Sequence, residues 1–234
     1  MKRFFLDLLF PKRCVGCRKF GSFLCSNCFS YISFTTNFSC PQCNAPAFNG
    51  MTHPKCSKKY GLDGVVPVVV YKGIVKKLLY QFKYPPYLSG LAPILSEILY
   101  EGLIQNEHFY KILETGPIFV PVPLHATRLK SRGYNHAGLL AEGLATKLGY
   151  SYVAQYLIRI KNTKPQYKLK KEERLKNIKN AFNLNAKYVM SVKGKTIIVV
   201  DDITTSFATL SECAKVLKRA GASQVVGVTL AKEA

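Results

Sequence analysis

Short apolar runs alternate with amphipathic segments along the chain from residue 64 onward. Continuous runs of β-branched residues are typical of buried strands, whereas apolar residues spaced three and four apart are typical of helices. Strands are expected at GVVPVVVY (64–71), PIFVPVP (117–123), YVAQYLIRI (152–160), KTIIVVDD (195–202) and SQVVGVTLA (223–231). This alternation predicts an α/β fold in which helices cover both faces of a mostly parallel sheet.

The segments between these runs carry the helical pattern. Helices are expected at IVKKLLYQFKY (74–84), LSGLAPILSEILYEGLIQ (88–105), HAGLLAEGLATKLGY (136–150) and TLSECAKVLKRAGA (209–222). The proline pair at 85–86 ends the first of these helices, and Gly149 closes the third. Residues 161–179 are dense in lysine and contain Pro165, so a mobile loop followed by a short helix is expected there.

Two adjacent carboxylates, Asp201 and Asp202, end the fourth apolar run, and a cluster of hydroxyl groups follows them. Ligands bind outside the carboxyl ends of strands in such sheets, and the start of the next helix offers backbone N–H groups and a dipole that attract an anion. The hydroxyls of Thr205, Ser206 and Thr209 would complete a phosphate cradle, while the carboxylates suit sugar hydroxyls or a magnesium-bound diphosphate. The pattern therefore predicts a sugar-phosphate site, with simple helix capping by Asp202 or Thr204 as the alternative.

Seven of the eight cysteines lie in the first 56 residues; six form three pairs separated by two residues, and Cys56 follows His53 at the same spacing. This spacing lets both side chains of one turn reach the same ion, and two such turns complete a tetrahedral zinc site. The spacing does not decide whether the turns bind in order or interleave, and the chain would hold a single zinc if His53 were solvated. The expected zinc ligands are Cys14, Cys17, Cys25, Cys28, Cys40, Cys43, His53 and Cys56. Cys213 lies in a helical pattern and is expected in the core.

The composition adds a strong charge imbalance, since 34 Lys and Arg residues face 13 Asp and Glu residues for a net charge of +21. Such a balance favours a polyanionic partner, nucleic acid or anionic lipid, unless it reflects a generally basic proteome. Asp7 and Pro11 interrupt the apolar start, and no run approaches a membrane span, so a cytoplasmic protein is expected. A basic amphipathic N-terminal helix would pack on its own protein or contact the inner face of the membrane. We expect a cysteine-rich domain at 1–60 and an α/β domain at 61–234.

The run VVDDITTSFAT (199–209) resembles the phosphoribosyl pyrophosphate motif of type I phosphoribosyltransferases, where Thr-Thr-Gly-Ala-Thr follows two acids and two variable residues. Ser206 stands in place of the second Thr of that motif, and Phe207 in place of its Gly. The resemblance implies a phosphoribosyltransferase-like domain that takes phosphoribosyl pyrophosphate with magnesium. It implies a catalytic role for Asp201 and Asp202 in holding the ribose. The ligand contacts that it implies are Asp201, Asp202, Thr204, Thr205, Ser206, Phe207, Ala208 and Thr209.

Two further segments narrow this resemblance to the ComF family of competence proteins. VPVPLHATRLKSRGYNHAGLLAEGLA (120–145) and RIKNTKPQYKLKKEERLKNIKNAF (159–182) are similar to ordered motifs of that family, and the cysteine pairs match its double zinc ribbon. His136 replaces the usual Gln of the family, and His53 replaces a Cys. By resemblance, Arg132 is a charge partner of the pyrophosphate, and residues 161–174 form a loop that closes over the ligand.

The family resemblance implies action in natural transformation on incoming single-stranded DNA, together with proteins of the competence machinery. One hypothesis is a binding module that grips the strand through backbone charge and through stacking on tyrosines such as Tyr134 or Tyr167. A second is an enzyme that transfers the phosphoribosyl group to an unidentified acceptor. A third joins the two, with phosphoribosyl pyrophosphate as a regulatory ligand that is not turned over.

Overall fold

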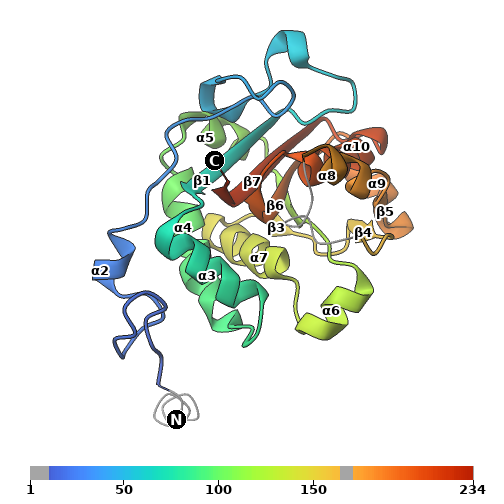
Figure 1. Ribbon diagram of the computed structural model, residues 1–234. Coiled ribbons are helices and arrows are strands. Elements are labelled where there is room, and N and C mark those ends of the chain that lie inside the picture. Colours follow the sequence, from blue (N-terminus) through green and yellow to red (C-terminus); the bar gives the residue numbers. More distant parts are fainter. Residues whose placement is uncertain (1–10, 164–170, 234) are drawn as a thin grey trace.

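The computed structural model describes residues 11–163 and 171–233, and its centre is a sheet of five parallel strands (Figure 1). The order across the sheet is β1-β7-β6-β2-β3, and every neighbouring pair is parallel. The strands are β1 (Gly64–Val70), β2 (Ile118–Pro121), β3 (Ser151–Tyr152), β6 (Thr196–Thr204) and β7 (Gln224–Lys232). The predicted α/β class with a parallel sheet is confirmed.

Helices cover both faces of this sheet, as the sequence predicts. One face carries α3 (Gly73–Lys83), α4 (Ala92–Leu103), α5 (Glu107–Leu113) and α7 (His136–Leu148). The other carries α8 (Lys171–Ile178), α9 (Val189–Val192) and α10 (Ala208–Arg219). The period of two along β6 explains the arrangement, because Ile198 and Val200 belong to the first core while Ile197 and Val199 belong to the second. Cys213 is fully buried in the second core, as expected.

The close approach of α7 to α4 depends on a small residue. A Cβ atom at Gly143 would lie 2.4 Å from Ser96 Oγ, so a larger side chain there would push the two helices apart. Gly149 ends α7 in the left-handed conformation, with a φ of 76°, and its N–H bonds the carbonyl of Thr146. This end of α7 is the one predicted from the sequence.

The predicted strand at 152–160 is wrong. The structure has β3 at Ser151–Tyr152 and β4 (Leu157–Arg159), which belong to different sheets. β4 pairs antiparallel with β5 (Phe182–Leu184) in a separate two-stranded sheet. An exposed turn at 154–155 breaks the run, because the chain leaves the edge of the main sheet after its hydrogen bond from Val153 N to Phe119 O. The apolar pattern alone does not show this change of partner.

Several short elements complete the described part. The expected helix at 88–105 is divided into the short 3₁₀ turn η3 (Ser89–Leu91) and α4, and α6 (Ala126–Arg132) follows β2. The remaining short elements are α2 (Ser26–Phe29), η1 (Phe48–Gly50), η2 (Pro54–Cys56) and η5 (Ala186–Tyr188). The expected helix after the lysine-rich loop is α8, which begins at Lys171, so the last residues of the predicted closing loop are helical. Much of that loop, including Tyr167, lies outside the described residues.

The cysteine-rich segment lies along the open edge of β1. Thr35 N donates to Val68 O at 2.8 Å and Val70 N donates to Ser33 O at 2.9 Å, so this segment pairs with β1 like a short antiparallel strand. Figure 1 shows one cysteine lobe, with α2, beside α3, and the other at the opposite end of β1. No helix among the described residues is long and apolar enough to cross a bilayer. The expected N-terminal helix lies outside the described residues, and the boundary at residue 60 stays a prediction.

Candidate functional site

The first cysteine lobe brings together the sulfur atoms of Cys14, Cys17, Cys25 and Cys28. All four lie within 4.8 Å of one another, and the Sγ atoms of Cys17 and Cys25 are 3.6 Å apart. A tight turn presents the first pair, because Arg18 adopts a φ of 65° and its N–H bonds Cys14 O. The second pair lies at the start of α2, where Phe29 N bonds Cys25 O.

The second lobe repeats this construction. Asn44 has a φ of 62° and its N–H bonds Cys40 O, while Cys56 N bonds His53 O in the second half of the lobe. His53 Nδ1 lies 3.4 Å from Cys43 Sγ and 4.0 Å from Cys56 Sγ. Its Nε2 lies 3.0 Å from Pro46 O, a contact that fixes the proton on Nε2 and leaves Nδ1 with a free lone pair.

These distances fit tetrahedral zinc. With Zn–S near 2.3 Å and Zn–N near 2.0 Å, neighbouring ligand atoms of a tetrahedron are about 3.4–3.8 Å apart, as the shortest contacts in both lobes are. The pairs combine in chain order and do not interleave, which the spacing left open. All eight predicted ligands are therefore brought together, in two groups of four. Zinc in each lobe would hold the two halves of a segment that has little apolar core of its own.

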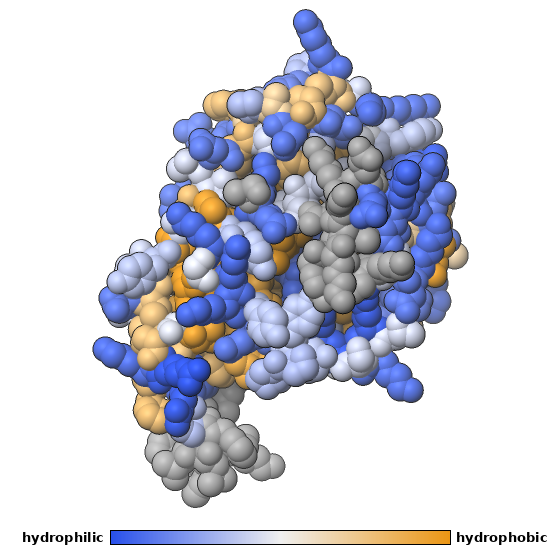
Figure 2. Space-filling model, viewed as in Figure 1, coloured by the Kyte–Doolittle hydropathy of each residue, from blue (hydrophilic) through white to orange (hydrophobic). Residues whose placement is uncertain are grey.

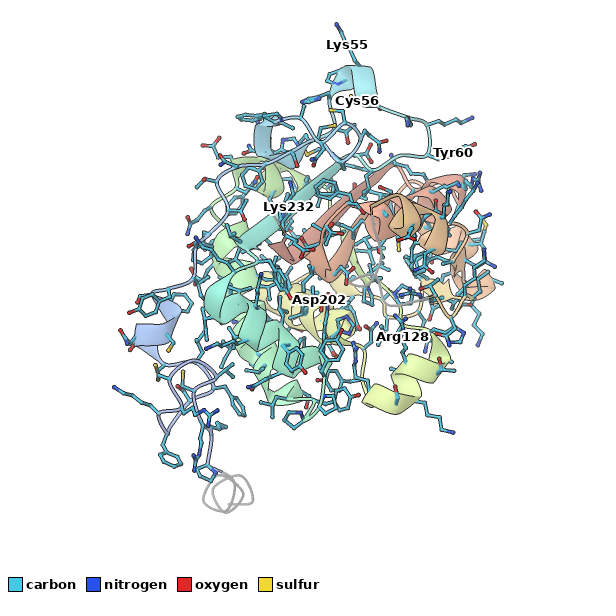
Figure 3. The ribbon with its side chains drawn as sticks, viewed as in Figure 1. Lys55, Cys56, Tyr60, Arg128, Asp202 and Lys232 are labelled. Carbon is cyan, nitrogen blue, oxygen red and sulfur yellow. The ribbon has the colours of Figure 1, made fainter. Side chains whose placement is uncertain are left out.

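A cleft of about 240 Å³ lies at the carboxyl ends of the central strands β6 and β2. Figure 3 shows Asp202 at the centre of the molecule and Arg128 on α6. Among the described residues, four cationic and three acidic side chains line the cleft, and tyrosines, aliphatic residues, His136, Thr205 and Thr209 form the rest of its wall. Its charged residues are Lys83, Arg128, Arg132, Arg159, Asp201, Asp202 and Glu233.

Asp202 is the buried acid of the cleft. Lys83 Nζ lies 2.8 Å from Asp202 Oδ2, and only 2% of the Asp202 side chain is exposed. Burial alone would raise the pKa of Asp202, but the charge of Lys83, helped by His136, lowers it below the usual range. Burial alone would lower the pKa of Lys83, but the charges of the two aspartates outweigh this effect and raise the pKa above its ordinary value. Asp202 and Lys83 are therefore both charged.

Asp201 behaves in the opposite way. Burial of its carboxyl group and repulsion from Asp202 raise the pKa of Asp201 to about 8. Its Oδ1 accepts a hydrogen bond of 2.9 Å from the N–H of Asp202. Two adjacent carboxyl groups thus differ in charge near neutral pH, so Asp201 can donate a hydrogen bond where Asp202 can only accept one.

His136 connects Asp202 to Arg132. Arg132 Nη1 lies 2.5 Å from His136 Nδ1, and since a guanidinium has only donors, Nδ1 must accept. The ring proton is then on Nε2, which faces Asp202 Oδ2 at 3.4 Å. Burial lowers the pKa of His136 to about 3 and so keeps the ring neutral, as the charges of Lys83 and Arg132 also do. His136 therefore holds Arg132 and the carboxylate in fixed positions.

Arg128 and Arg159 belong to the cleft although the sequence interpretation did not select them. Arg128 Nη2 donates to Thr163 O, and Arg159 Nη2 donates to Thr163 Oγ1. Burial lowers the pKa of both guanidinium groups, and repulsion from a neighbouring arginine adds to it in each case. Both arginines lie inside the two segments that resemble family motifs, but nothing in their spacing shows that they meet.

The hydroxyl-rich turn enters the cleft only in part. Thr205 and Thr209 line it, whereas Thr204, Ser206, Phe207 and Ala208 do not. Phe207 adopts the left-handed conformation, with a φ of 56°, and its side chain is buried in the core between α10 and the sheet. The large side chain that replaces glycine therefore turns away from the cleft. Ser206 Oγ is buried and has no partner among the described residues.

The fold and the site together define an α/β protein with a polar cleft at its strand ends and a double zinc ribbon at its N-terminus. A family model described as a double zinc ribbon domain matches residues 5–57. The chain is 31% identical over 208 residues to "DNA utilization protein YhgH" of Escherichia coli, covering 86% of this chain and 87% of that protein. It is 30% identical over 227 residues to "Competence protein F" of Haemophilus influenzae, with 92% and 95% covered.

A third relative is "Competence protein ComFC" of Bacillus subtilis, 29% identical over 217 residues, with 88% of this chain and 83% of that protein covered. These matches extend through both the ribbon and the α/β part. The chain belongs to the ComF family of competence proteins. Membership of this family supports zinc ligation by the ribbon and a role in competence.

Proposed function

We propose that this is a cytoplasmic competence protein that handles incoming single-stranded DNA and whose cleft binds phosphoribosyl pyrophosphate with magnesium. The observation that carries the cleft assignment is the meeting of an aspartate pair with three arginines beside the start of α10. A phosphorylated ribose needs both kinds of group, because its hydroxyls bind carboxyl groups and its phosphates bind guanidinium groups.

The charge inventory of the cleft supports an anionic ligand. Lys83 is already paired with Asp202, so among the described residues of the cleft the cationic groups left to receive an anion are Arg128, Arg132 and Arg159. The backbone N–H groups at the start of α10 lie next to Thr205 and Thr209 and add the positive end of a helix dipole. Magnesium would be held by Asp201, a half-buried carboxyl group that lines the cleft, and would neutralise part of the charge of a diphosphate.

Binding without turnover is the simpler form of this proposal. The turn that meets phosphate has a left-handed Phe207, and Arg132 is already held by His136, so both parts differ from the glycine and glutamine of the family pattern. The catalytic role of Asp201 and Asp202 stays a prediction. Release of pyrophosphate in the presence of purified bases or nucleic acid would show transfer, and its absence alongside ligand binding would show a regulatory site.

Calorimetry with phosphoribosyl pyrophosphate and magnesium tests the cleft. Arg132→Ala should weaken binding by about tenfold or more, because it removes a charged donor from the cleft. Lys130→Ala is the matched control, since it removes a cation from the same helix at an exposed position outside the cleft. No heat of binding with the unaltered protein, or equal losses in both variants, would contradict the proposed ligand site.

The DNA role is supported by the net charge and by the names of the relatives. Tyr134 contributes little to stacking, because its hydroxyl donates to Phe82 O and its ring packs on Phe82 at 5.7 Å. Salt dependence tests the role directly, since backbone contacts make affinity fall steeply with added salt. Absence of strand binding at low salt would remove this part of the proposal.

A further inference from the structure

A second hollow, of about 760 Å³, lies between the first cysteine lobe and α3. We call it the ribbon groove. Figure 2 shows hydrophilic and apolar side chains mixed over this part of the surface, where α2 and α3 lie in Figure 1. The ribbon groove is lined by Pro11, Arg13, Cys14, Val15, Gly16, Arg18, Phe23, Tyr71, Lys76, Lys77, Tyr80, Gln81 and Leu88.

Among the described residues, the lining of the ribbon groove is basic and includes no acidic side chain. Its four cations come from two parts of the chain, Arg13 and Arg18 from the lobe and Lys76 and Lys77 from α3. All four are exposed, so none is committed to a buried partner. Cations that line one groove from two parts of the chain match a ligand that carries a regular series of negative charges.

Aromatic rings accompany these cations. Phe23, Tyr71 and Tyr80 line the same groove, and the Tyr80 side chain is 59% exposed. Rings of this kind stack with unpaired bases, which a double helix does not present and a membrane surface does not contain. The combination of cations and rings therefore favours a single strand over duplex DNA or lipid.

The ribbon groove and the cleft share a wall. Tyr71 and Tyr80 line both, and α3 carries the connection because residues four apart lie on one helical face. Along this face, Lys76 lies in the groove, Tyr80 lies between the two hollows, and Tyr84 lies in the cleft together with Lys83. A strand that follows α3 thus leads from the ribbon to the aspartate pair.

We propose that the ribbon groove and the cleft form one continuous site for a single-stranded nucleic acid, whose backbone lies in the groove and one of whose sugar-phosphate units reaches the cleft. The inference rests on the proposed function of the cleft, because each nucleotide of a strand, like the proposed small ligand, carries phosphate on a pentose and so offers an anionic group to the arginines of the cleft. Strand and small ligand should then exclude one another.

Fluorescence anisotropy with a labelled oligothymidine tests the groove. The double variant Lys76→Ala, Lys77→Ala should bind about tenfold more weakly at low salt and lower the salt slope by about 0.7 for each lost phosphate contact. Lys58→Ala, Lys59→Ala is the matched control, since it removes the same charge from exposed positions on the other lobe. Equal effects of the two double variants would overturn the groove assignment.

Tyr80→Ala tests stacking without changing charge. It should weaken strand binding about fivefold or more and leave the salt slope unchanged. Vesicles containing anionic lipid separate the other polyanion: if the Lys76 and Lys77 variant lost vesicle binding but kept strand binding, the groove would be a membrane surface and the proposal would be wrong.

Competition tests continuity. Calorimetric titration of phosphoribosyl pyrophosphate into protein saturated with oligothymidine should give a much weaker apparent affinity than titration into the free protein. Equal affinities would show two separate sites and overturn the inference, while the proposed function of the cleft would stand. Failure of the small ligand to bind the free protein would instead contradict the proposed function.

Discussion

Lys83 Nζ and Asp202 Oδ2, 2.8 Å apart, form an ion pair between the end of α3 and a central strand. Only 2% of the Asp202 side chain is exposed, so removing the lysine leaves a buried carboxylate without its main counter-charge. We expect Lys83→Ala to lower the free energy of unfolding by about 3 kcal/mol. Urea denaturation followed by circular dichroism measures this change.

The matched control for that experiment is the exposed pair of Lys147 and Glu97, whose side chains are 35% and 48% exposed. Lys147→Ala should cost less than about 1 kcal/mol, since solvent screens such pairs. A loss from Lys83→Ala no larger than the loss from Lys147→Ala would mean that Asp202 finds another partner or becomes protonated at little cost.

Asp201 should make the protein less stable as the pH rises. Its pKa is raised to about 8 in the folded state from an ordinary value of 3.8, so the folded protein holds a proton that the unfolded chain releases between these values. Stability from this group is complete below pH 3.8 and is lost as the pH rises through 8. Asp201→Asn should flatten the decline of the melting temperature over this interval, and an unchanged pH profile would contradict the assignment.

His136 should act in the opposite direction. Its pKa is lowered to about 3, so the unfolded chain takes up a proton below pH 6.5 that the folded protein refuses. Stability is therefore lost as the pH falls from 6.5 toward 3. His136→Gln should reduce this acid sensitivity while keeping the geometry, because a glutamine amide can accept from Arg132 and donate to Asp202.

Carboxyl groups titrate in the same pH range as His136. The prediction is therefore checked by the difference between the pH profiles of the melting temperature of the unaltered protein and of the His136→Gln variant. His108→Gln serves as the control, because His108 is half-buried on α5 and lies outside the cleft. If both variants shifted the profile equally, the acid sensitivity would belong to histidines in general and not to the buried ring.

Zinc content should depend on His53 in a specific way. We expect two zinc ions in the unaltered chain, one after His53→Ala, and two again after His53→Cys, because a thiolate at this position restores a four-sulfur site. Metal analysis of the purified proteins by mass spectrometry gives these counts. Two ions in His53→Ala would show that the imidazole is not needed as a ligand.

Phe207→Gly combines two opposing effects. Glycine relieves the left-handed backbone at a φ of 56°, worth about 1 kcal/mol, but it deletes a buried aromatic ring, which costs about 3–5 kcal/mol. It also removes the ring over which Lys232 Nζ lies at 5.1 Å. We expect a net loss of about 2–4 kcal/mol in urea denaturation, and a gain in stability would show that the ring contributes little.

The pattern of apolar and polar residues along the sequence was sufficient to predict the main strands and helices. Continuous apolar runs and helix ends such as Gly149 are local signals, so the parallel sheet and its covering helices could be predicted. The break at 154–155 could not, because it depends on which strand becomes the partner of β4. Tertiary pairing of this kind leaves no local trace in the chain.

The cleft was predictable only where one motif carries its residues. Asp201, Asp202, Thr205 and Thr209 follow one another along the chain, and Arg132 entered through the family resemblance. Lys83 lies more than a hundred residues away from Asp202, at the end of an ordinary amphipathic helix, and nothing in its surroundings indicates an ion pair. The side to which Phe207 turns likewise depends on backbone torsion that residue types do not reveal.

The pairing of residues 33–35 with β1 gives the metal a protective role toward the whole molecule. This segment occupies the outer hydrogen-bonding side of the sheet, and it is fastened at both ends by the zinc lobes. If the lobes lost their ions and this segment dissociated from β1, the backbone N–H and C=O groups of β1 would become unpaired. An unpaired edge strand can pair with the same strand of another chain, which leads to aggregation. Removal of zinc by a chelator should therefore cause aggregation while the α/β domain is still folded, before the domain unfolds.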